Sequence, residues 1–335
     1  MARKKQARVP APAEVVIVAL PRTVASTVTG PADIFSLSGV LWPMIHGRPA
    51  APSFRVRIAS LDGAPVTCLN GTRLIPDCAV AEVAAAHLVV LSAADVATVP
   101  ETAAVLTPWL RRLHAAGATL ASVCTGAFAL AASGLLDGLR ATTHWGFAET
   151  FRAAHPHVHL TVEKLIVDEG RLVTGGGVHS YFDLCTFLVE RFQGHAVATE
   201  TARSLLLDMG RRSQMPYAAL TPTSRHGDKA IAAVQELLEK NFQDPPDVEG
   251  VAKACAMSPR TLARRFKRAT GDTVHGYVQR VRIERAKELL VTTPEPVEQV
   301  ALAVGYGDVT AFRKVFRSLA KVTPSDYRKT FSAAG

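Results

Sequence analysis

A cysteine stands at a strand-to-helix transition in the stretch LASVCTGAFALAASGLL. Small and apolar residues predict a buried strand over 119–123, and a helical pattern follows over 125–136. A turn of this kind exposes the sulfur, and a helix N-terminus lowers the pKa of a thiol and favours anions. His144 could serve as the base for a Cys124 nucleophile. Cysteine-dependent catalysis is therefore one interpretation of this stretch.

A second interpretation makes these residues part of a binding pocket or of the core. His144 and Trp145 stand before a predicted helix in RATTHWGFAETF. Trp145 could stack on a cationic ligand, but a His-Trp pair is also common in packed cores. For Cys124, a structural or ligand-lining thiol is the alternative to turnover and to redox sensing.

The cysteines and the apolar runs of the sequence indicate the cellular compartment and exclude some partners. The cysteines are Cys68, Cys78, Cys124, Cys185 and Cys255, an odd number without a CxxC pair. This pattern argues against a disulfide framework and a zinc site, so we expect a reducing cytoplasm, no metal and no cofactor. Apolar runs stay well short of the roughly 20 residues that a membrane helix needs, so no membrane partner is expected.

The positive charge of the chain is concentrated in its last part. The net charge is +9, and residues 258–335 hold 15 Lys and Arg against 7 Asp and Glu. A local basic excess of this kind indicates a polyanionic partner, most often nucleic acid.

The elements that must position these residues fall into two parts. Predicted strands at 14–20, 54–60, 87–92, 119–123, 164–168 and 171–175 alternate with predicted helices at 31–41, 101–115, 125–136, 146–154 and 178–193. Alternation of this kind predicts βαβ units and a parallel sheet covered on both faces. A further helix is expected at 196–209, and nearly everything after Lys229 reads as helix. The predicted organisation is a disordered basic tail (1–13), an α/β domain (14–209), a linker (210–228) and an all-α domain (229–331).

The all-α part contains an internal repeat. VEGVAKACAMSPRTLARRFK (248–267) matches VEQVALAVGYGDVTAFRKVFR (297–317), with Ser258 and Asp308 as predicted helix caps. Each copy has a helix-turn-helix layout, and a predicted helix over 274–291 joins the copies. The polar faces of the second helices carry Arg260, Arg264 and Lys267, and Thr310, Arg313, Lys314 and Arg317. Two such units could enter successive major grooves about 34 Å apart, whereas the alternative is a plain helical bundle with a solvated basic face.

Residues 229–331 resemble the AraC/XylS DNA-binding domain along its whole length. The resemblance rests on SPRTLARRFKRATG, RIERAKELL, VEQVALAVGY, AFRKVFR and TPSDYRKTF. It implies base reading near Arg260, Ala263 and Arg264 in the first unit, and near Val309, Thr310, Arg313 and Lys314 in the second. Lys321 and Arg328 are further candidates for phosphate contacts.

Residues 14–215 resemble the PfpI-like, class I glutamine-amidotransferase-like fold, as found before the AraC domain in GlxA-type regulators. TGPADIF, VCTGAFALAASGLLDG, GGGVHSYFDLCTFLVERF and RRSQMPY carry this resemblance, which implies a flavodoxin-like parallel-sheet sandwich. Amidotransferase-like enzymes have His where this chain has Thr125, and the related hydratases have an acidic residue where it has Thr27. We therefore expect a non-catalytic domain. Its pocket would bind a small, possibly nitrogen-containing metabolite through Gly30, Cys124, Thr125, His144 and Trp145.

Three functions follow from these features. The leading one is a cytoplasmic, nucleoid-associated transcription regulator that binds promoter DNA and a small-molecule effector. Family analogy favours activation of RNA polymerase and a homodimer formed through the α/β domain. The second is a cysteine-dependent amidase or hydratase with accessory DNA binding, which predicts turnover that Cys124→Ala abolishes. The third is a non-specific architectural DNA binder, which predicts a steep salt dependence without sequence preference.

Overall fold

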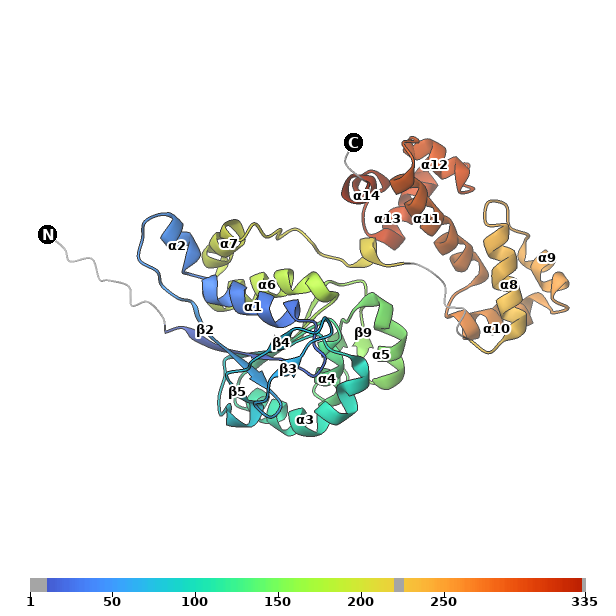
Figure 1. Cartoon of the computed structure of the whole chain (residues 1–335). Coiled ribbons are helices and arrows are strands. Elements are labelled where there is room, and N and C mark those ends of the chain that lie inside the picture. The colour runs from blue at the N-terminus through green and yellow to red at the C-terminus, as the bar shows by residue number, and fades with distance from the viewer. Residues whose placement is uncertain (1–10, 220–225, 333–335) are drawn as a thin grey trace. The chain divides into compact units, whose positions relative to one another are not determined.

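A computed structural model describes residues 11–219 and 226–332 of the chain (Figure 1). The chain divides into two units, Met1–Gln214 and Met215–Gly335. Most of the predicted basic tail and the central part of the predicted linker lie outside the described residues. Among the residues described, no helix is both long and apolar enough to cross a membrane.

The first unit is built on a seven-stranded sheet with the strand order β10-β11-β7-β6-β1-β2-β5. The strands are β1 (Ala13–Val18), β2 (Phe54–Ser60), β5 (Cys78–Ala79), β6 (Leu88–Leu91), β7 (Thr119–Val123), β10 (Ile166–Asp168) and β11 (Leu172–Gly175). All neighbours pair in parallel except β10 and β11, which form an antiparallel hairpin at the edge. The connection between these two strands is far too short for a parallel crossover. Two small pairs lie outside this sheet: β3 (Val66–Thr67) with β4 (Arg73–Leu74), and β8 (Arg140–Ala141) with β9 (His159–Leu160).

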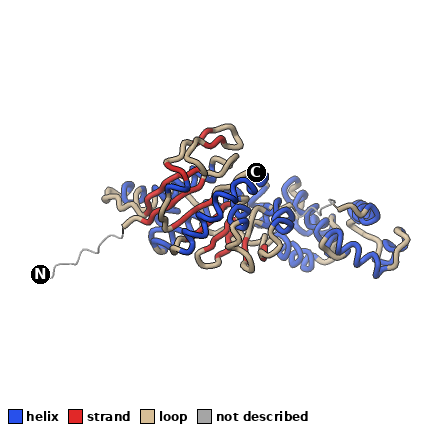
Figure 2. The backbone as a smooth tube through the Cα atoms, turned by 90° about the horizontal axis from the view of Figure 1, so that it is seen from below, coloured by secondary structure: helices blue, strands red, loops and turns tan. Residues whose placement is uncertain are grey.

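Helices cover both faces of the sheet (Figure 1), and Figure 2 shows the strands in red among helices in blue. The helices of this unit are α1 (Ser26–Leu37), α2 (Leu41–Ile45), α3 (Val99–Ala115), α4 (Gly126–Ala132), α5 (Ala148–Ala154), α6 (Tyr181–Gln193) and α7 (His195–Ser204). Val16 and Val18 pack on one face with α3 and α4, whereas Val15 and Ile17 pack on the other with α1 and α6. Successive strand residues point to opposite faces, so both faces of β1 are apolar and buried.

The largest difference from the predicted elements concerns α1. The prediction of a helix over 31–41 placed its start after the Gly30-Pro31 pair, but α1 begins at Ser26 and carries Pro31 inside. Proline removes a hydrogen bond within a helix, yet here the ring is buried against the core. Two other predicted helices begin with a short 3-10 turn, at Trp145–Phe147 and at Val178–Ser180.

The second unit is all helical and has two cores. Its helices are α8 (Lys229–Lys240), α9 (Val248–Ala254), α10 (Pro259–Thr270), α11 (Val274–Thr292), α12 (Val297–Ala303), α13 (Val309–Ala320) and α14 (Pro324–Phe331). The first half of α11 packs with α8, α9 and α10, and its second half packs with α12, α13 and α14. Both predicted caps are present: Ser258 Oγ accepts from the Thr261 amide (3.2 Å), and a carboxylate oxygen of Asp308 accepts from the Thr310 amide (2.7 Å).

The repeat differs at the helix ends. The residue after α10 is Gly271, with φ 75°, whereas the equivalent residue after α13 is Lys321, with φ 60°. A left-handed conformation costs a non-glycine residue about 1–2 kcal/mol, and glycine adopts it freely. At this helix end the second helix-turn-helix copy therefore carries a local strain that the first copy avoids.

Lys321→Gly is expected to raise the free energy of unfolding of the helical unit by about 1 kcal/mol, because it relieves this strain. Gly271→Lys is the matched change and should lower it by a similar amount, since no atom lies within 4 Å of the Cβ position at Gly271. Urea denaturation of the full chain, followed through the helical transition, measures both. Equal effects of the same sign would contradict this account.

Candidate functional site

Cys124 occupies the sharp turn between β7 and α4. Its φ of 55° is left-handed, a conformation that side chains rarely adopt and that is typical of functional turns. The Cys124 amide donates to the Gly175 carbonyl (2.8 Å), and its carbonyl accepts from Thr143 Oγ1 (2.8 Å). The turn is therefore fixed from both sides, by the last residue of β11 and by a side chain that follows β8.

The Cys124 thiol is buried, not exposed as the turn alone suggested. Cys124 is 3% exposed, and burial raises the pKa of its thiol to about 11. Hydrogen bonds from Thr125 act in the opposite direction but are outweighed. The expected lowering of the thiol pKa by the helix N-terminus is thus wrong for this residue, and the sulfur is a neutral thiol at pH 7.

His144 is not positioned as a general base for the Cys124 thiol. Its Nδ1 accepts from the Gly146 amide (3.0 Å) and so caps the 3-10 turn that follows. Within residues 11–219 and 226–332, no hydrogen bond joins Cys124 to His144. Desolvation lowers the pKa of His144, which keeps its ring neutral. The arrangement lacks an activated nucleophile.

The position at which the related hydratases have an acidic residue is Thr27 in this chain. Thr27 is buried, and its hydroxyl donates to the Val24 carbonyl (2.7 Å) and accepts from the Ala93 amide (3.0 Å). This threonine therefore ties two loops together and supplies no proton. Asp33, the nearest carboxylate along the chain, is exposed.

A cavity of about 280 Å³ lies beside this turn. It is lined by the loop that follows β6, the Cys124 turn, the 3-10 turn after β8 and the turn after β11. The lining residues are Val24, Leu69, Ala93, Ala94, Asp95, Val96, Cys124, Thr125, His144, Phe147 and Val178. Three of these segments follow the carboxyl ends of the neighbouring parallel strands β6, β7 and β11, the usual ligand position in open α/β sheets. We call this cavity the effector pocket.

Three of the five predicted pocket residues line the effector pocket: Cys124, Thr125 and His144. Gly30 does not, because the ring of Tyr181 lies 2.3 Å from where a Cβ would stand, so Gly30 serves the packing of α1 on α6. Trp145 is not among the lining residues either, and its amide donates to Gln214 Oε1 (3.1 Å).

The sequence analysis missed Asp95, Phe147 and Val178 in the pocket wall. Asp95 brings a carboxylate, and it pairs with Arg22 at 3.0 Å. The sequence offered one signal, because Asp95 stands in the short stretch SAADVAT that follows the buried strand β6.

At alkaline pH, Cys124 should reduce the stability of the α/β unit. A thiol that titrates near 9.0 when unfolded and at about 11 when folded stabilises the fold fully below pH 9. That contribution is lost as the pH rises toward 11, by about 2–3 kcal/mol. Urea denaturation at pH 8 and at pH 11 should show this loss for the wild type and a smaller loss for Cys124→Ala. The same loss in both proteins would contradict a buried neutral thiol.

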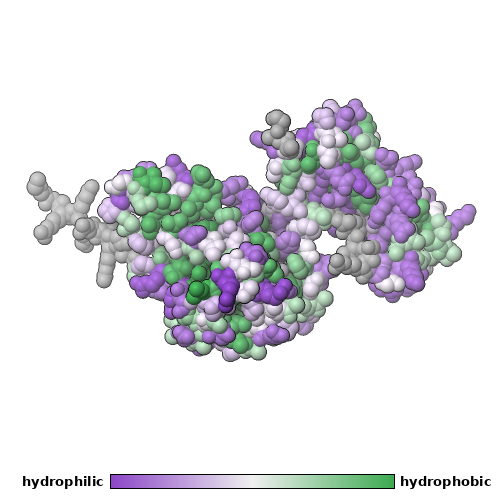
Figure 3. Space-filling model, in the orientation of Figure 1, coloured by the Kyte–Doolittle hydropathy of each residue, from purple (hydrophilic) through white to green (hydrophobic). Residues whose placement is uncertain are grey.

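The second candidate site comprises the second helix of each repeat. Leu262 and Phe266 of α10, and Phe312 and Phe316 of α13, are buried in the cores. The opposite faces are solvent-accessible: Arg260, Ala263, Arg264, Lys267, Thr310, Arg313, Lys314 and Arg317 are exposed, and Val309 is half-buried. Hydrophilic residues predominate on the face of the helical unit that Figure 3 shows.

The predicted DNA-contact residues differ in their present partners. Arg260, Arg264, Lys267, Lys314 and Arg317 form no hydrogen bond or ion pair in the part of the chain that the structure describes. Arg313 pairs with Glu298 at 2.6 Å. Arg328 donates to the Leu290 carbonyl (2.9 Å) and the Glu295 carbonyl, which indicates that it fastens α14 to the end of α11.

Comparisons with known proteins identify the family of each unit. The DJ-1/PfpI family model matches residues 15–191, and a helix-turn-helix domain model matches residues 251–330. The chain is 30% identical over 287 residues to the HTH-type transcriptional regulator CdhR of Pseudomonas aeruginosa, covering 85% of this chain and 84% of that protein. It is 29% identical over 222 residues to the regulator GlxA of Rhizobium meliloti, covering 66% and 68%.

A solved structure supports the fold of the first unit. DJ-1beta of Drosophila melanogaster superposes with a TM-score of 0.51 at 19% identity, covering 59% of this chain and all of that one. The α/β architecture and the paired helix-turn-helix units predicted from the sequence are thus confirmed. The chain belongs to the HTH-type transcriptional regulators that join a DJ-1/PfpI domain to an AraC-type helix-turn-helix domain, and it is a DNA-binding regulator of transcription.

Proposed function

We propose that the effector pocket binds a small metabolite without converting it, and that the bound metabolite changes how the helical unit binds promoter DNA. The observation that carries this proposal is the neutral, buried Cys124 thiol, which has neither His144 nor an acid as a partner. A pocket of about 280 Å³ with apolar walls and one carboxylate suits a small, nitrogen-containing ligand. Binding regulates only if the ligand has different affinities for two states of the protein.

The two exposed basic helices support reading of two adjacent major-groove segments by one chain. α10 and α13 each expose arginine and lysine side chains that can reach guanine edges and phosphates. The shared helix α11 fixes the two helix-turn-helix copies to each other within the helical unit. Lys321 stays a phosphate-contact candidate, and activation through RNA polymerase at the nucleoid is the expected output.

A homodimer through the α/β unit is part of the proposal. Met44 and Ile45 of α2 are 62% and 60% exposed, and Figure 3 shows a hydrophobic area over this helix. Exposed apolar patches mark interaction surfaces in many proteins. Sedimentation velocity of the wild type and of Met44→Lys would test this part, with dissociation expected in the variant.

Complementation of a deletion strain tests the non-catalytic assignment. The wild type and Cys124→Ser, at matched protein levels, should restore the same transcripts, because the sulfur does no chemistry in this account. A hydroxyl in place of the thiol keeps the size of the side chain. Restoration by the wild type alone, with a Cys124→Ser protein that folds and binds DNA, would refute a pocket that only binds.

A further inference from the structure

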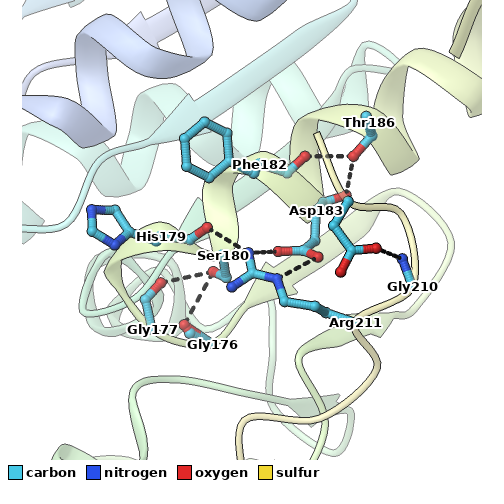
Figure 4. A network of polar contacts seen from close by, with 10 residues as sticks. Gly176, Gly177, His179, Ser180, Phe182, Asp183, Thr186, Gly210 and Arg211 are labelled. Atoms are coloured by element: carbon cyan, nitrogen blue, oxygen red, sulfur yellow. Dashed lines mark hydrogen bonds and ion pairs between the residues drawn. The ribbon is translucent and has the colours of Figure 1, made fainter. Parts of the chain in front are cut away.

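The segment Arg211–Gln214, the last part of the α/β unit, is fastened by buried polar contacts. The Arg211 guanidinium pairs with the buried carboxylate of Asp183 and donates to the His179 carbonyl (3.1 Å), as Figure 4 shows. Ser213 Oγ donates to the Glu163 carbonyl (2.7 Å). These contacts exclude a freely moving chain at this point, although the sequence had predicted a linker from residue 210 onward.

Gln214 has the most demanding environment of this segment. It is 3% exposed, and its Nε2 donates to the carbonyls of Thr143 (2.8 Å) and Val162 (2.7 Å). Its Oε1 accepts from the Trp145 amide (3.1 Å). Both donor hydrogens and the acceptor are therefore used inside the α/β unit.

The backbone that this segment holds is the wall of the effector pocket. Gln214 bonds to Thr143 and Trp145, the two neighbours of His144, which lines the pocket. Arg211 bonds to the carbonyl of His179, which directly follows the lining residue Val178. A ligand that displaces either wall must strain these contacts or move the segment.

The next residues along the chain are anchored in the helical unit. Met215 packs against the core formed by α11, α12, α13 and α14, and the ring of Tyr217 lies 5.2 Å from that of Phe331. Ala218 is buried, and its carbonyl accepts from Lys287 Nζ (2.8 Å).

Lys287 itself is unusual for a lysine. It is 3% exposed on α11, with Glu284 at 3.7 Å and the ring of Tyr327 at 5.6 Å. An ammonium group is rarely buried unless its hydrogen bonds are satisfied. The Ala218 carbonyl therefore stabilises the buried Lys287 ammonium by accepting one of its hydrogen bonds. Lys287 thereby holds the start of the helical unit on the helix shared by both helix-turn-helix copies.

We propose that residues 211–218 transmit the state of the effector pocket to the DNA-reading helices. This inference rests on the proposed sensing function and names its route. No residue separates Gln214, bound to the pocket wall, from Met215, packed on the helical core. A displacement of the wall therefore acts directly on the backbone at Met215, because no residue without contacts lies between the two anchors. A flexible tether would require residues between the two anchors that are free of contacts.

The test uses reciprocity, so it needs no identified effector. If the pocket wall and the DNA-binding surface are coupled, DNA bound to the helices must change the wall. We would measure hydrogen–deuterium exchange of the full chain with and without a promoter fragment selected from genomic DNA by binding. The expected result is a change of about threefold or more in exchange at the Trp145 and Gly146 amides on DNA binding.

An insertion separates transmission from folding and from DNA binding. Gly-Ser-Gly-Ser placed between Gln214 and Met215 keeps every contact on each side, so the affinity for DNA should stay within about threefold while the change at Trp145 disappears. The same insertion between Pro222 and Thr223, beyond the anchored Ala218, is the matched control and should keep the change. Lys287→Met keeps the chain length and should diminish the change.

Two results would overturn the inference. One is an unchanged pocket wall in a wild-type chain that anisotropy shows to be bound to DNA. The other is a wild-type response in both the Gln214–Met215 insertion and Lys287→Met. A wild-type chain that binds no DNA would refute the proposed function itself, and anisotropy reports this separately.

Discussion

Arg264→Ala is expected to weaken binding to the selected promoter site by about 5–150-fold, equivalent to about 1–3 kcal/mol. Arg264 is exposed on α10 and has no partner in the described ranges, so its guanidinium is available for a guanine edge. Binding to random DNA should change much less. Fluorescence anisotropy with both DNAs at one salt concentration measures the discrimination.

Two variants separate base reading from charge. Arg264→Lys keeps the positive charge but loses the planar fork, so it should lose most of the discrimination as well. Arg152→Ala removes one positive charge from the α/β unit and should leave the discrimination between the two DNAs unchanged. Equal losses on selected and random DNA for Arg264→Ala would make this residue a phosphate contact.

Arg313 gives the corresponding prediction for the second helix-turn-helix copy. Its pairing with Glu298 is solvent-exposed, and such pairs contribute little, so DNA can take over the guanidinium. Arg313→Ala should therefore relax discrimination in the other half of the site. Losses from Arg264→Ala and Arg313→Ala that map to the same base pairs would contradict two separate reading helices.

Gln214→Ala is expected to lower the free energy of unfolding of the α/β unit by about 2–4 kcal/mol. The change leaves the carbonyls of Thr143 and Val162 and the amide of Trp145 without their partner in a buried place. Each unsatisfied group costs far more than the hydrogen bond contributed. Urea denaturation followed by tryptophan fluorescence measures the loss, because the Trp145 amide is one of the groups bonded to Gln214.

Gln193→Ala is the matched control in the same unit. Gln193 is half-buried, and its amide makes one hydrogen bond, to the Ser53 carbonyl (3.0 Å). Its removal should cost about 1 kcal/mol or less. A Gln214→Ala protein as stable as Gln193→Ala would show that water replaces the lost contacts, and the pocket wall would then not depend on this side chain.

The sequence predicted those elements whose signals are local. Strand β7 and the helices of both repeats follow from apolar periodicity and from caps such as Ser258 and Asp308. The start of α1 did not, because Gly30 and Pro31 resemble a helix-breaking pair. Packing of α1 on the sheet overrides that local signal, and the close approach of Tyr181 explains the glycine better than a ligand does.

Residues that meet only through tertiary packing were harder to predict. Asp95, Phe147 and Val178 come from three separate segments of the pocket wall, and no spacing in the sequence relates them. Gln214 stands in a polar stretch that reads as linker, and its role depends on carbonyls more than fifty residues away. The protonation of Cys124 likewise depends on burial, which no local pattern reveals.

The most direct test of the whole account is the ratio of two dissociation constants for the full chain. One is for the selected promoter site and the other for a scrambled fragment of equal length, both at about 0.15 M salt. A sequence-reading regulator should bind its site about 10³-fold or more tightly than the scrambled fragment. Equal affinities that fall together as salt rises would contradict the account and leave a non-specific DNA binder.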